Sequence, residues 1–485
     1  MSSIDLELCY LSASEVLKRF KACSLSPVEY LAELIRRAEE TEPAINAFAF
    51  TWFDQAMDQA KEAEAKYARK DTNIRELEGL PIAVKDAADI EGQPLTKGSL
   101  YLKDNISTET HYSIQRLLDA GGIVHARTTT PEFGCSGVCD SKIYGTTHTP
   151  WKLGYTSGGS SGGSGAALAV GSSPVATGSD IGGSIRIPAS CCGLVGLKPT
   201  RNRVPTGPTF GDWLNGLAGE LVVSRSVRDT AAILDAVQGT DVGPPDLITP
   251  PERPYMEELT QAPGKLRIAW SDKAISGVEV HPDVVAGLHE TVKLMESLGH
   301  ELVEDQIEID WSHFFEALIV LWTAYLAWAI DFLANAVKRT PSYDNMERVT
   351  VELYNHGKSL TAMQMHDALA NINTVSRQSG VLFEKNDLFL TPTIAQPPLI
   401  LGTLDQNEAG VDAREWTRRV FDWVPFTPLF NSTGQPAISL PLHWSPDGLP
   451  IGMQFAASLN DEATLLRLAA QLEEAKPWKE KRPPV

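Results

Sequence analysis

From Gly79 onward, short apolar runs alternate with segments of helical periodicity. Each run is only a few residues long and rich in aliphatic side chains, which is typical of buried strands. The segments between them repeat apolar residues every three or four positions, as amphipathic helices do. This alternation predicts an α/β protein in which helices pack around a sheet. The expected strands lie at 82–84, 123–125, 175–177, 194–197 and 266–270, and the expected helices at 113–120, 164–170, 227–237 and 283–298.

The two ends of the chain extend this pattern. Ser12 and Ser26 each stand three positions before a glutamate, the pattern of a helix-capping box, and Pro27 suits a first helical turn. Together with an alanine- and charge-rich segment at 54–70, they predict that residues 1–75 form a helical region. The C-terminal part returns to strands at 387–390, 437–440 and 452–456 and closes with an amphipathic helix at 461–473.

The charge balance limits the partners of this chain. Its 485 residues include 42 basic and 62 acidic side chains, for a formal net charge of −20. Nucleic acids and anionic membranes need their phosphates neutralised by Lys and Arg, so this balance disfavours both. The six cysteines are unevenly spaced and lack the paired ligands of a structural zinc site, so we expect reduced thiols. The composition therefore favours a small-molecule partner.

One stretch, residues 311–384, is predicted to be helical and is unusually aromatic. Its aromatic side chains form either a core between helices or the lining of a wide apolar cleft. Within it, the fourteen apolar residues 317–330 are too few to cross a bilayer, so we expect a buried helix. The N-terminus shows no basic region followed by an apolar core, as a signal peptide would. These features predict a soluble, cytoplasmic protein.

Two glycine-rich stretches, 158–165 and 178–186, contain the serines Ser160 and Ser184. Glycine this dense lets several backbone N–H groups converge on one point. Such a group of donors can hold the oxyanion that forms when a hydroxyl attacks a carbonyl carbon. A tight buried turn would show the same glycines, so this pattern alone leaves both interpretations open.

A serine nucleophile needs a base, and Lys85 is the candidate, at the end of the apolar run 80–84. Burial disfavours the ammonium form and lowers the pKa of a lysine toward the range of a general base. An ion pair between Lys85 and Asp86 is the structural alternative. The pattern GxSxG at 158–162 would suggest a histidine base, but the preceding residues 150–154 make a poor strand, and that motif needs one.

Taken together, these segments resemble the amidase signature family. The resemblance covers nearly the whole chain, and its motifs are jointly specific. They are the lysine motif at 79–86, the pocket segment at 130–134, the glycine-rich stretches at 158–164 and 178–189, the run 192–200, and the carboxy-terminal motifs at 390–393, 431–437 and 448–454.

For the fold, the resemblance implies a mixed central β-sheet surrounded by helices in one domain, 1–485. Residues 76–240 would form the catalytic core, after the helical region 1–75, and residues 300–385 would form a helical insertion at the substrate cleft. No metal and no organic cofactor is implied. We expect a monomer or a homodimer that acts on a small-molecule amide or carbamate.

For the site, the resemblance implies a Ser-cisSer-Lys triad. Ser184 would be the nucleophile, Ser160 the bridging serine and Lys85 the base. The resemblance also implies an oxyanion hole from the amides of Ile181, Gly182, Gly183 and Ser184; loop-holding roles for Ser161, Asp180 and Arg186; and substrate binding by Gly134, Ser136, Phe210 and Trp213.

The predicted activity is hydrolysis of simple or aryl amides through a seryl acyl-enzyme, with carbamates (urethanes) and esters as related substrates. The alternative is a glutamine-dependent amidotransferase subunit acting in a complex. The segment 206–220 departs from the pattern of the subunit that amidates charged tRNA, and its aromatic residues suggest an apolar lid. An anion-binding protein is disfavoured by the net charge and by the lack of a GxxxxGK[ST] motif after a strand.

Overall fold

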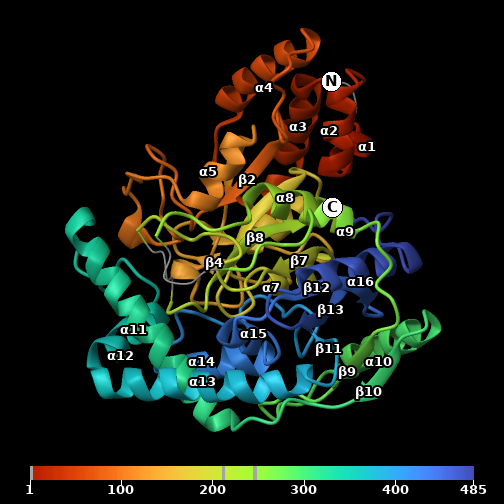
Figure 1. Cartoon of the computed structure of the whole chain (residues 1–485). Helices are drawn as coiled ribbons and strands as arrows, with labels where there is room; N and C mark the ends of the chain where they lie inside the picture. Colours follow the sequence, from red (N-terminus) through yellow and green to blue (C-terminus); the bar gives the residue numbers. More distant parts are fainter. Residues whose placement is uncertain (1–3, 210–213, 244–247) are drawn as a thin grey trace.

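The computed structural model describes residues 4–209, 214–243 and 248–485. Within these residues, one eleven-stranded sheet runs through the molecule with helices around it (Figure 1). In spatial order its strands are β1 (Phe48–Thr51), β3 (Ile123–Thr128), β2 (Pro81–Lys85), β6 (Val175–Asp180), β8 (Gly219–Ser224), β7 (Val195–Lys198), β12 (Ala437–Trp444), β13 (Pro450–Ala457), β11 (Leu388–Pro392), β9 (Arg267–Trp270) and β10 (Glu301–Glu304).

The sheet is mixed. Strands β3, β2 and β6 are parallel neighbours, and so are β11, β9 and β10, whereas the remaining neighbours are antiparallel. The predicted α/β class and the mixed central sheet are thereby confirmed. A separate two-stranded ribbon pairs β4 (Asp140–Ser141) with β5 (Gly145–Thr146).

Helices cover the sheet and extend beyond it. Figure 1 shows α1–α4 at one end of the molecule and α11–α14 at the other. The helices are α1 (Leu6–Cys9), α2 (Ala13–Lys21), α3 (Pro27–Ile45), α4 (Phe53–Ala68), α5 (Tyr112–Asp119), α6 (Gly162–Ala169), α7 (Arg186–Cys192), α8 (Val227–Val237), α9 (Tyr255–Glu258), α10 (Pro282–Ser297), α11 (Trp311–Val337), α12 (Arg348–Ser359), α13 (Ala362–Phe383), α14 (Ala413–Trp423), α15 (Pro428–Thr433) and α16 (Glu462–Ala475), with the 3-10 turns η1 (Leu100–Leu102) and η2 (Glu132–Gly134).

The N-terminal helices begin where the sequence predicts. The side chain of Ser12 accepts a hydrogen bond from the Glu15 amide at the start of α2, and Ser26 does the same for the first turn of α3. The region is not wholly helical, however, because β1 joins the edge of the sheet beside β3. Two further strands of the sheet, β8 and β10, were not predicted; both are short and contain glutamate, which is depleted in strands.

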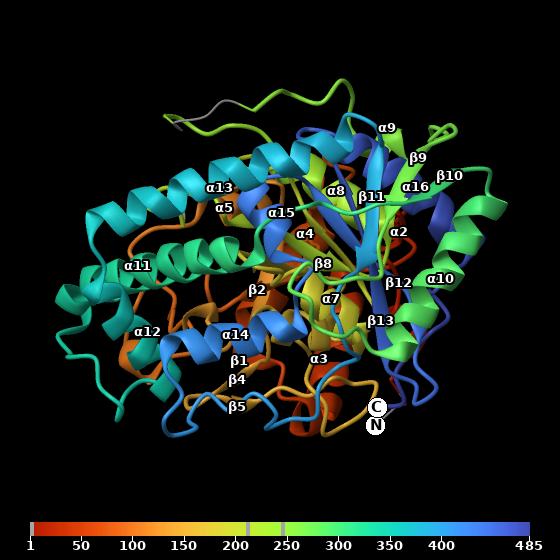
Figure 2. The ribbon, with the colours of Figure 1, turned by 90° about the horizontal axis from the view of Figure 1, so that it is seen from below.

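The apolar stretch 317–330 is part of a longer helix than expected. Helix α11 has 27 residues, so the expectation that this segment is too short to cross a bilayer does not hold. By length and composition, 311–334 could cross a membrane, a test that core helices of soluble proteins also pass, and half of its most apolar window is buried. The helix packs against α12 and α13, and the three lie side by side in Figure 2. The buried part of its apolar surface therefore packs within the same chain, whereas Trp328 and Phe332 are about half exposed.

Candidate active site

Lys85 is the last residue of β2, which lies between the parallel strands β3 and β6. Its side chain is buried, and its Nζ lies 2.7 Å from Ser160 Oγ and 2.9 Å from Ser179 Oγ. Burial lowers the pKa of Lys85 to about 7. A large share of this side chain is therefore an uncharged amine near neutral pH, in hydrogen-bond contact with two hydroxyls.

Ser160 lies in the first glycine-rich loop, just before α6, and the Gly159–Ser160 peptide bond is cis. The loop passes through a crowded region. A Cβ at Gly159 would lie within 2.9 Å of backbone atoms of residues 136–138, and one at Gly134 would lie 3.1 Å from Ser160 Oγ. Glycine at these positions is therefore what allows Ser160 to reach Lys85.

Ser184 lies in the second glycine-rich loop, between β6 and α7. The two loops are joined because the Ser161 amide donates to the Ser184 carbonyl at 3.2 Å. Gly183 has a φ of +130° and leaves no room for a side chain, since a Cβ there would lie 2.3 Å from Thr427 Oγ1. Ser184 itself is partly exposed and lines an apolar pocket.

Asp180 holds the Ser184 loop in shape. Its carboxylate accepts hydrogen bonds from the amides of Gly183 (2.8 Å) and Ile185 (3.1 Å) and forms a buried ion pair with Arg186. Burial alone would raise the pKa of Asp180, but the Arg186 guanidinium and a hydrogen bond from Asn431 outweigh it and lower the pKa to about 2. The carboxylate is therefore ionised at all working pH values.

The hydrogen bond to Asp180 bears on the expected role of Gly183 in the oxyanion hole. The Gly183 amide is already bonded to Asp180, so it does not project freely toward the position of an oxyanion. The predicted donor role of Gly183 therefore does not fit the geometry, and Gly183 supplies backbone conformation instead.

Two residues of the carboxy-terminal motifs, Asn431 and Gln454, contact the side chain of Arg186. Arg186 donates to Asn431 Oδ1 at 2.6 Å and to Gln454 Oε1 at 2.7 Å, and both partners are buried. The sequence indicated these motifs without giving them a role. Their role is to hold the guanidinium that neutralises Asp180, which in turn fixes the loop of Ser184.

The pocket at Ser184 is apolar and aromatic. Among the described residues, none of its lining side chains is an acid, a lysine, an arginine or a histidine. The ring of Trp322 in α11 packs closely on the Ser184 loop. A Cβ added at Gly182 would lie only 2.6 Å from that ring. The lining residues are Phe133, Gly134, Cys135, Ile181, Gly182, Ser184, Leu214, Trp322, Thr323, Leu326, Leu353, Trp416, Thr417 and Val420.

The four residues expected to bind substrate are placed differently. Gly134 lines the pocket, whereas Ser136 is buried beside it with its Oγ accepting from the Val138 amide at 3.2 Å. Phe210 and Trp213 lie outside the described residues. The sequence pointed to α11 through its aromatic residues, but Trp416 of α14 gave no signal.

A metal has no evident place here. Within the part of the chain that the structure describes, no group of three or more His, Cys, Asp or Glu side chains could hold a metal ion. What the site offers is a buried amine in contact with the hydroxyls of Ser160 and Ser179, and a further serine, Ser184, at the wall of an apolar pocket. These are the groups that an acyl-transfer hydrolase needs.

Comparison with known proteins agrees with this class. The Amidase family model matches residues 29–466. An acylamidase from Rhodococcus erythropolis is 33% identical over 481 residues, which cover 99% of this chain and 98% of that protein. A 6-aminohexanoate-cyclic-dimer hydrolase from Paenarthrobacter ureafaciens is 32% identical over 494 residues, covering 100% of this chain and 98% of the relative.

Solved structures give the same answer for the fold. The structure of 6-aminohexanoate cyclic dimer hydrolase complexed with substrate matches with a TM-score of 0.91 and 31% identity, over 98% of this chain and 99% of the other. The chain belongs to the amidase signature family. It is an amidase, an enzyme that hydrolyses amide C–N bonds.

Proposed function

We propose that this amidase works through a seryl acyl-enzyme in which Ser184 is the nucleophile, Ser160 the bridging serine and Lys85 the base. The observation that carries the proposal is the 2.7 Å contact between Lys85 Nζ and Ser160 Oγ in a buried setting. Ser184 adds the second part, because it lines the pocket and its loop is bonded to that of Ser160.

The proton moves along this line of groups. As Ser184 Oγ attacks the carbonyl carbon, its proton passes to Ser160, and the Ser160 proton passes to the Lys85 amine. Lys85 then returns a proton through Ser160 to the leaving nitrogen, so the C–N bond breaks with a neutral amine as product. An amide needs this acid step more than an ester does, because its leaving group is more basic.

The oxyanion would be held by the amides of Ile181, Gly182 and Ser184. All three belong to the loop that Asp180 fixes through the Gly183 and Ile185 amides. Preorganised donors of this kind stabilise the transition state by about 3 kcal/mol each. The loop-holding role of Arg186 is to keep Asp180 ionised and in place.

The pocket favours substrates with an uncharged, apolar acyl or aryl group. Its lining side chains among the described residues include three tryptophan or phenylalanine rings and no charged group. One relative is named an acylamidase, and another is named a 6-aminohexanoate-cyclic-dimer hydrolase. Simple and aryl amides fit best, and carbamates and esters follow because the same attack serves any activated acyl carbon.

A glutamine-dependent amidotransferase subunit fits less well. The ammonium and carboxylate of glutamine need charged partners, and the described pocket offers none. We therefore infer a free-standing hydrolase, with a monomer or homodimer in the cytoplasm as the expected form. Its partners would be small amides or carbamates, not nucleic acid or a membrane.

The direct test replaces the proposed nucleophile. Ser184→Ala should lower kcat for p-nitroacetanilide by about 10⁴-fold or more, because no acyl-enzyme can form. Intact-protein mass spectrometry during turnover should show an acetyl adduct on the parent enzyme and none on the variant. An alanine variant that turns over at the parent rate would remove Ser184 from the mechanism.

A further inference from the structure

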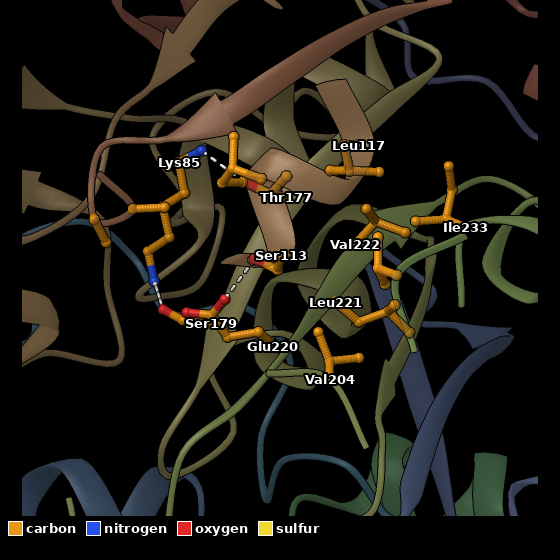
Figure 3. Close-up of a pocket in the computed structure, with 15 residues that line it drawn as sticks. Lys85, Ser113, Leu117, Thr177, Ser179, Val204, Glu220, Leu221, Val222 and Ile233 are labelled. Carbon is orange, nitrogen blue, oxygen red and sulfur yellow. Dashed lines mark hydrogen bonds between the residues drawn. The ribbon is translucent and has the colours of Figure 1, made fainter. Parts of the chain in front are cut away.

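A small buried cavity lies against Lys85 and is lined by polar groups from three other elements (Figure 3). These groups are Ser113 of α5, Ser179 of β6 and Glu220 of β8, and the rest of the lining is mostly apolar. The cavity measures about 20 Å³, which is enough for a single water molecule. The proposed mechanism uses none of these three side chains.

Glu220 is the centre of this group. It is buried, and its Oε2 accepts a hydrogen bond from Ser113 Oγ at 2.9 Å and lies 3.3 Å from His111 Nδ1. His111 Nδ1 is also 3.0 Å from Ser113 Oγ, so the imidazole, the hydroxyl and the carboxylate form one buried cluster. The carboxylate is therefore held in a fixed position by two neighbours.

Glu220 also faces the lysine. It pairs with Ser179 across the antiparallel strands β6 and β8, which places the two side chains side by side on one face of the sheet. Figure 3 shows the carboxylate between the hydroxyls of Ser179 and Ser113. Ser179 Oγ in turn lies 2.9 Å from Lys85 Nζ, so the Ser179 side chain contacts the amine and is also the cross-strand neighbour of Glu220.

Three other ionisable groups influence the pKa of Lys85, and none of them can act as its counter-charge. They are Asp180, Cys139 and Lys97. Asp180 is neutralised by Arg186, and burial raises the pKa of the Cys139 thiol, which keeps it uncharged. Lys97 is a cation that opposes a charge on Lys85. None of the three supplies an unneutralised negative charge.

Glu220 differs from Asp180 in this respect. Among the described residues, the basic side chain within salt-bridge distance of Glu220 is the imidazole of His111, and no arginine or lysine lies that close. A buried carboxylate without a permanent cation is costly, by several kcal/mol, unless other groups compensate. A lysine that becomes charged during each catalytic cycle is such a group.

We propose that Glu220 is a positioning residue that stabilises the ammonium form of Lys85 during acyl transfer. The proposal rests on the function given above, in which Lys85 takes a proton from Ser160. When that proton arrives, a cation forms in a desolvated site, and the negative charge beyond Ser179 lowers its free energy. Lys85 later returns the proton to Ser160, so Glu220 contributes charge and never carries the proton.

The test is the pH dependence of kcat/KM for p-nitroacetanilide in the parent and in Glu220→Gln. The amide keeps the shape and removes the charge. The acid limb should move to lower pH by about one unit, because the ammonium form of Lys85 loses its counter-charge. The plateau at high pH should fall several-fold, because Lys85 becomes a weaker base. A role in structure alone would lower activity equally at every pH.

Glu290→Gln is the matched control. Glu290 is also a carboxylate beside a histidine, 3.1 Å from His443 Nδ1, but it lies on α10, which packs near the opposite end of the sheet. The acid limb of the kcat/KM profile of Glu290→Gln should coincide with that of the parent. An unmoved acid limb in folded Glu220→Gln would overturn the proposal.

A second variant covers the case in which Glu220→Gln does not fold. Ser179→Ala removes the hydroxyl that contacts Lys85 Nζ and lies beside Glu220 on the neighbouring strand, and its acid limb should move in the same direction. An unmoved limb there also rejects the proposal. The proposed function fails separately, through an active Ser184→Ala, so the two failures can be told apart.

Discussion

Two lysines of this chain are equally buried at the ends of strands and differ in the groups that their amines contact. Lys85 ends β2 and Lys198 ends β7, each after an apolar run. Each is 2% exposed, and burial lowers the pKa of each to about 7. Lys85 contacts two serine hydroxyls, whereas Lys198 Nζ donates to the Pro199 carbonyl at 2.7 Å.

The difference shows what burial can and cannot do. Burial yields a lysine that is partly uncharged at neutral pH, which is the first requirement for a base. The second requirement is a neighbour with a proton to give. A hydroxyl has one and a carbonyl oxygen has none, so Lys198 can only donate at its contact. Both lysines meet the first requirement and Lys85 alone of the pair meets the second.

The largest expected effect comes from replacing each lysine by the uncharged methionine. Lys85→Met should lower kcat/KM for p-nitroacetanilide by about 10³- to 10⁴-fold, the contribution of a general base. Lys198→Met should keep most of the activity, because its Nζ contacts no hydroxyl of the site. Circular dichroism checks that both variants fold. Equal losses in the two variants would erase the distinction drawn between the lysines.

The next effect is the pH dependence of the parent enzyme. Protonated Lys85 cannot accept a proton, so kcat/KM should fall about tenfold for each pH unit below its pKa. With that pKa lowered to about 7 by burial, the rate should rise through pH 7 and level off above it. Lys198→Met should show the same acid limb. A flat profile from pH 6 to pH 10 argues against Lys85 as the base.

This pair of lysines also shows where prediction from the sequence stops. Both apolar runs with a terminal lysine are visible in the sequence, at 80–85 and 194–198. That pattern made a buried Lys85 one of two interpretations, and it does not give the neighbour of the amine, because Ser160 lies 75 positions from Lys85. The apolar run made Lys85 a candidate base, the resemblance to a family favoured that role over a purely structural one, and the contact with Ser160 supports it.

The fold was predictable to a similar extent. The α/β class, the capped helices α2 and α3 and most central strands follow from local pattern. Strand β8 was missed although it contains the apolar run 221–223, because that run is short and follows Gly219 and Glu220, two residue types that are depleted in strands. The partner of Glu220, Ser113, is 107 positions away, so the environment of this buried acid has no local signal. Pocket residues such as Trp416 are long-range features of the same kind.

The smallest expected effect concerns stability. A lysine with a folded pKa of about 7 binds its proton more weakly than in the unfolded chain, where the pKa is about 10.4. Between these values the unfolded chain holds the extra proton, so this lysine makes the free energy of unfolding rise with pH. Lys198→Met removes that contribution, so the variant gains most over the parent at pH 7 and below.

The advantage of Lys198→Met should then shrink by about 1.4 kcal/mol for each pH unit above 7. Urea denaturation of both chains at pH 6.5, 7.5 and 8.5 measures it as a difference, in which the other titrating groups cancel. Lys85→Met should show the same trend, because its amine is equally buried. The two lysines would then be alike in stability and unlike in catalysis, which assigns the difference to the hydroxyls. A constant gap between the curves for Lys198→Met would mean that Lys198 stays charged in the folded protein.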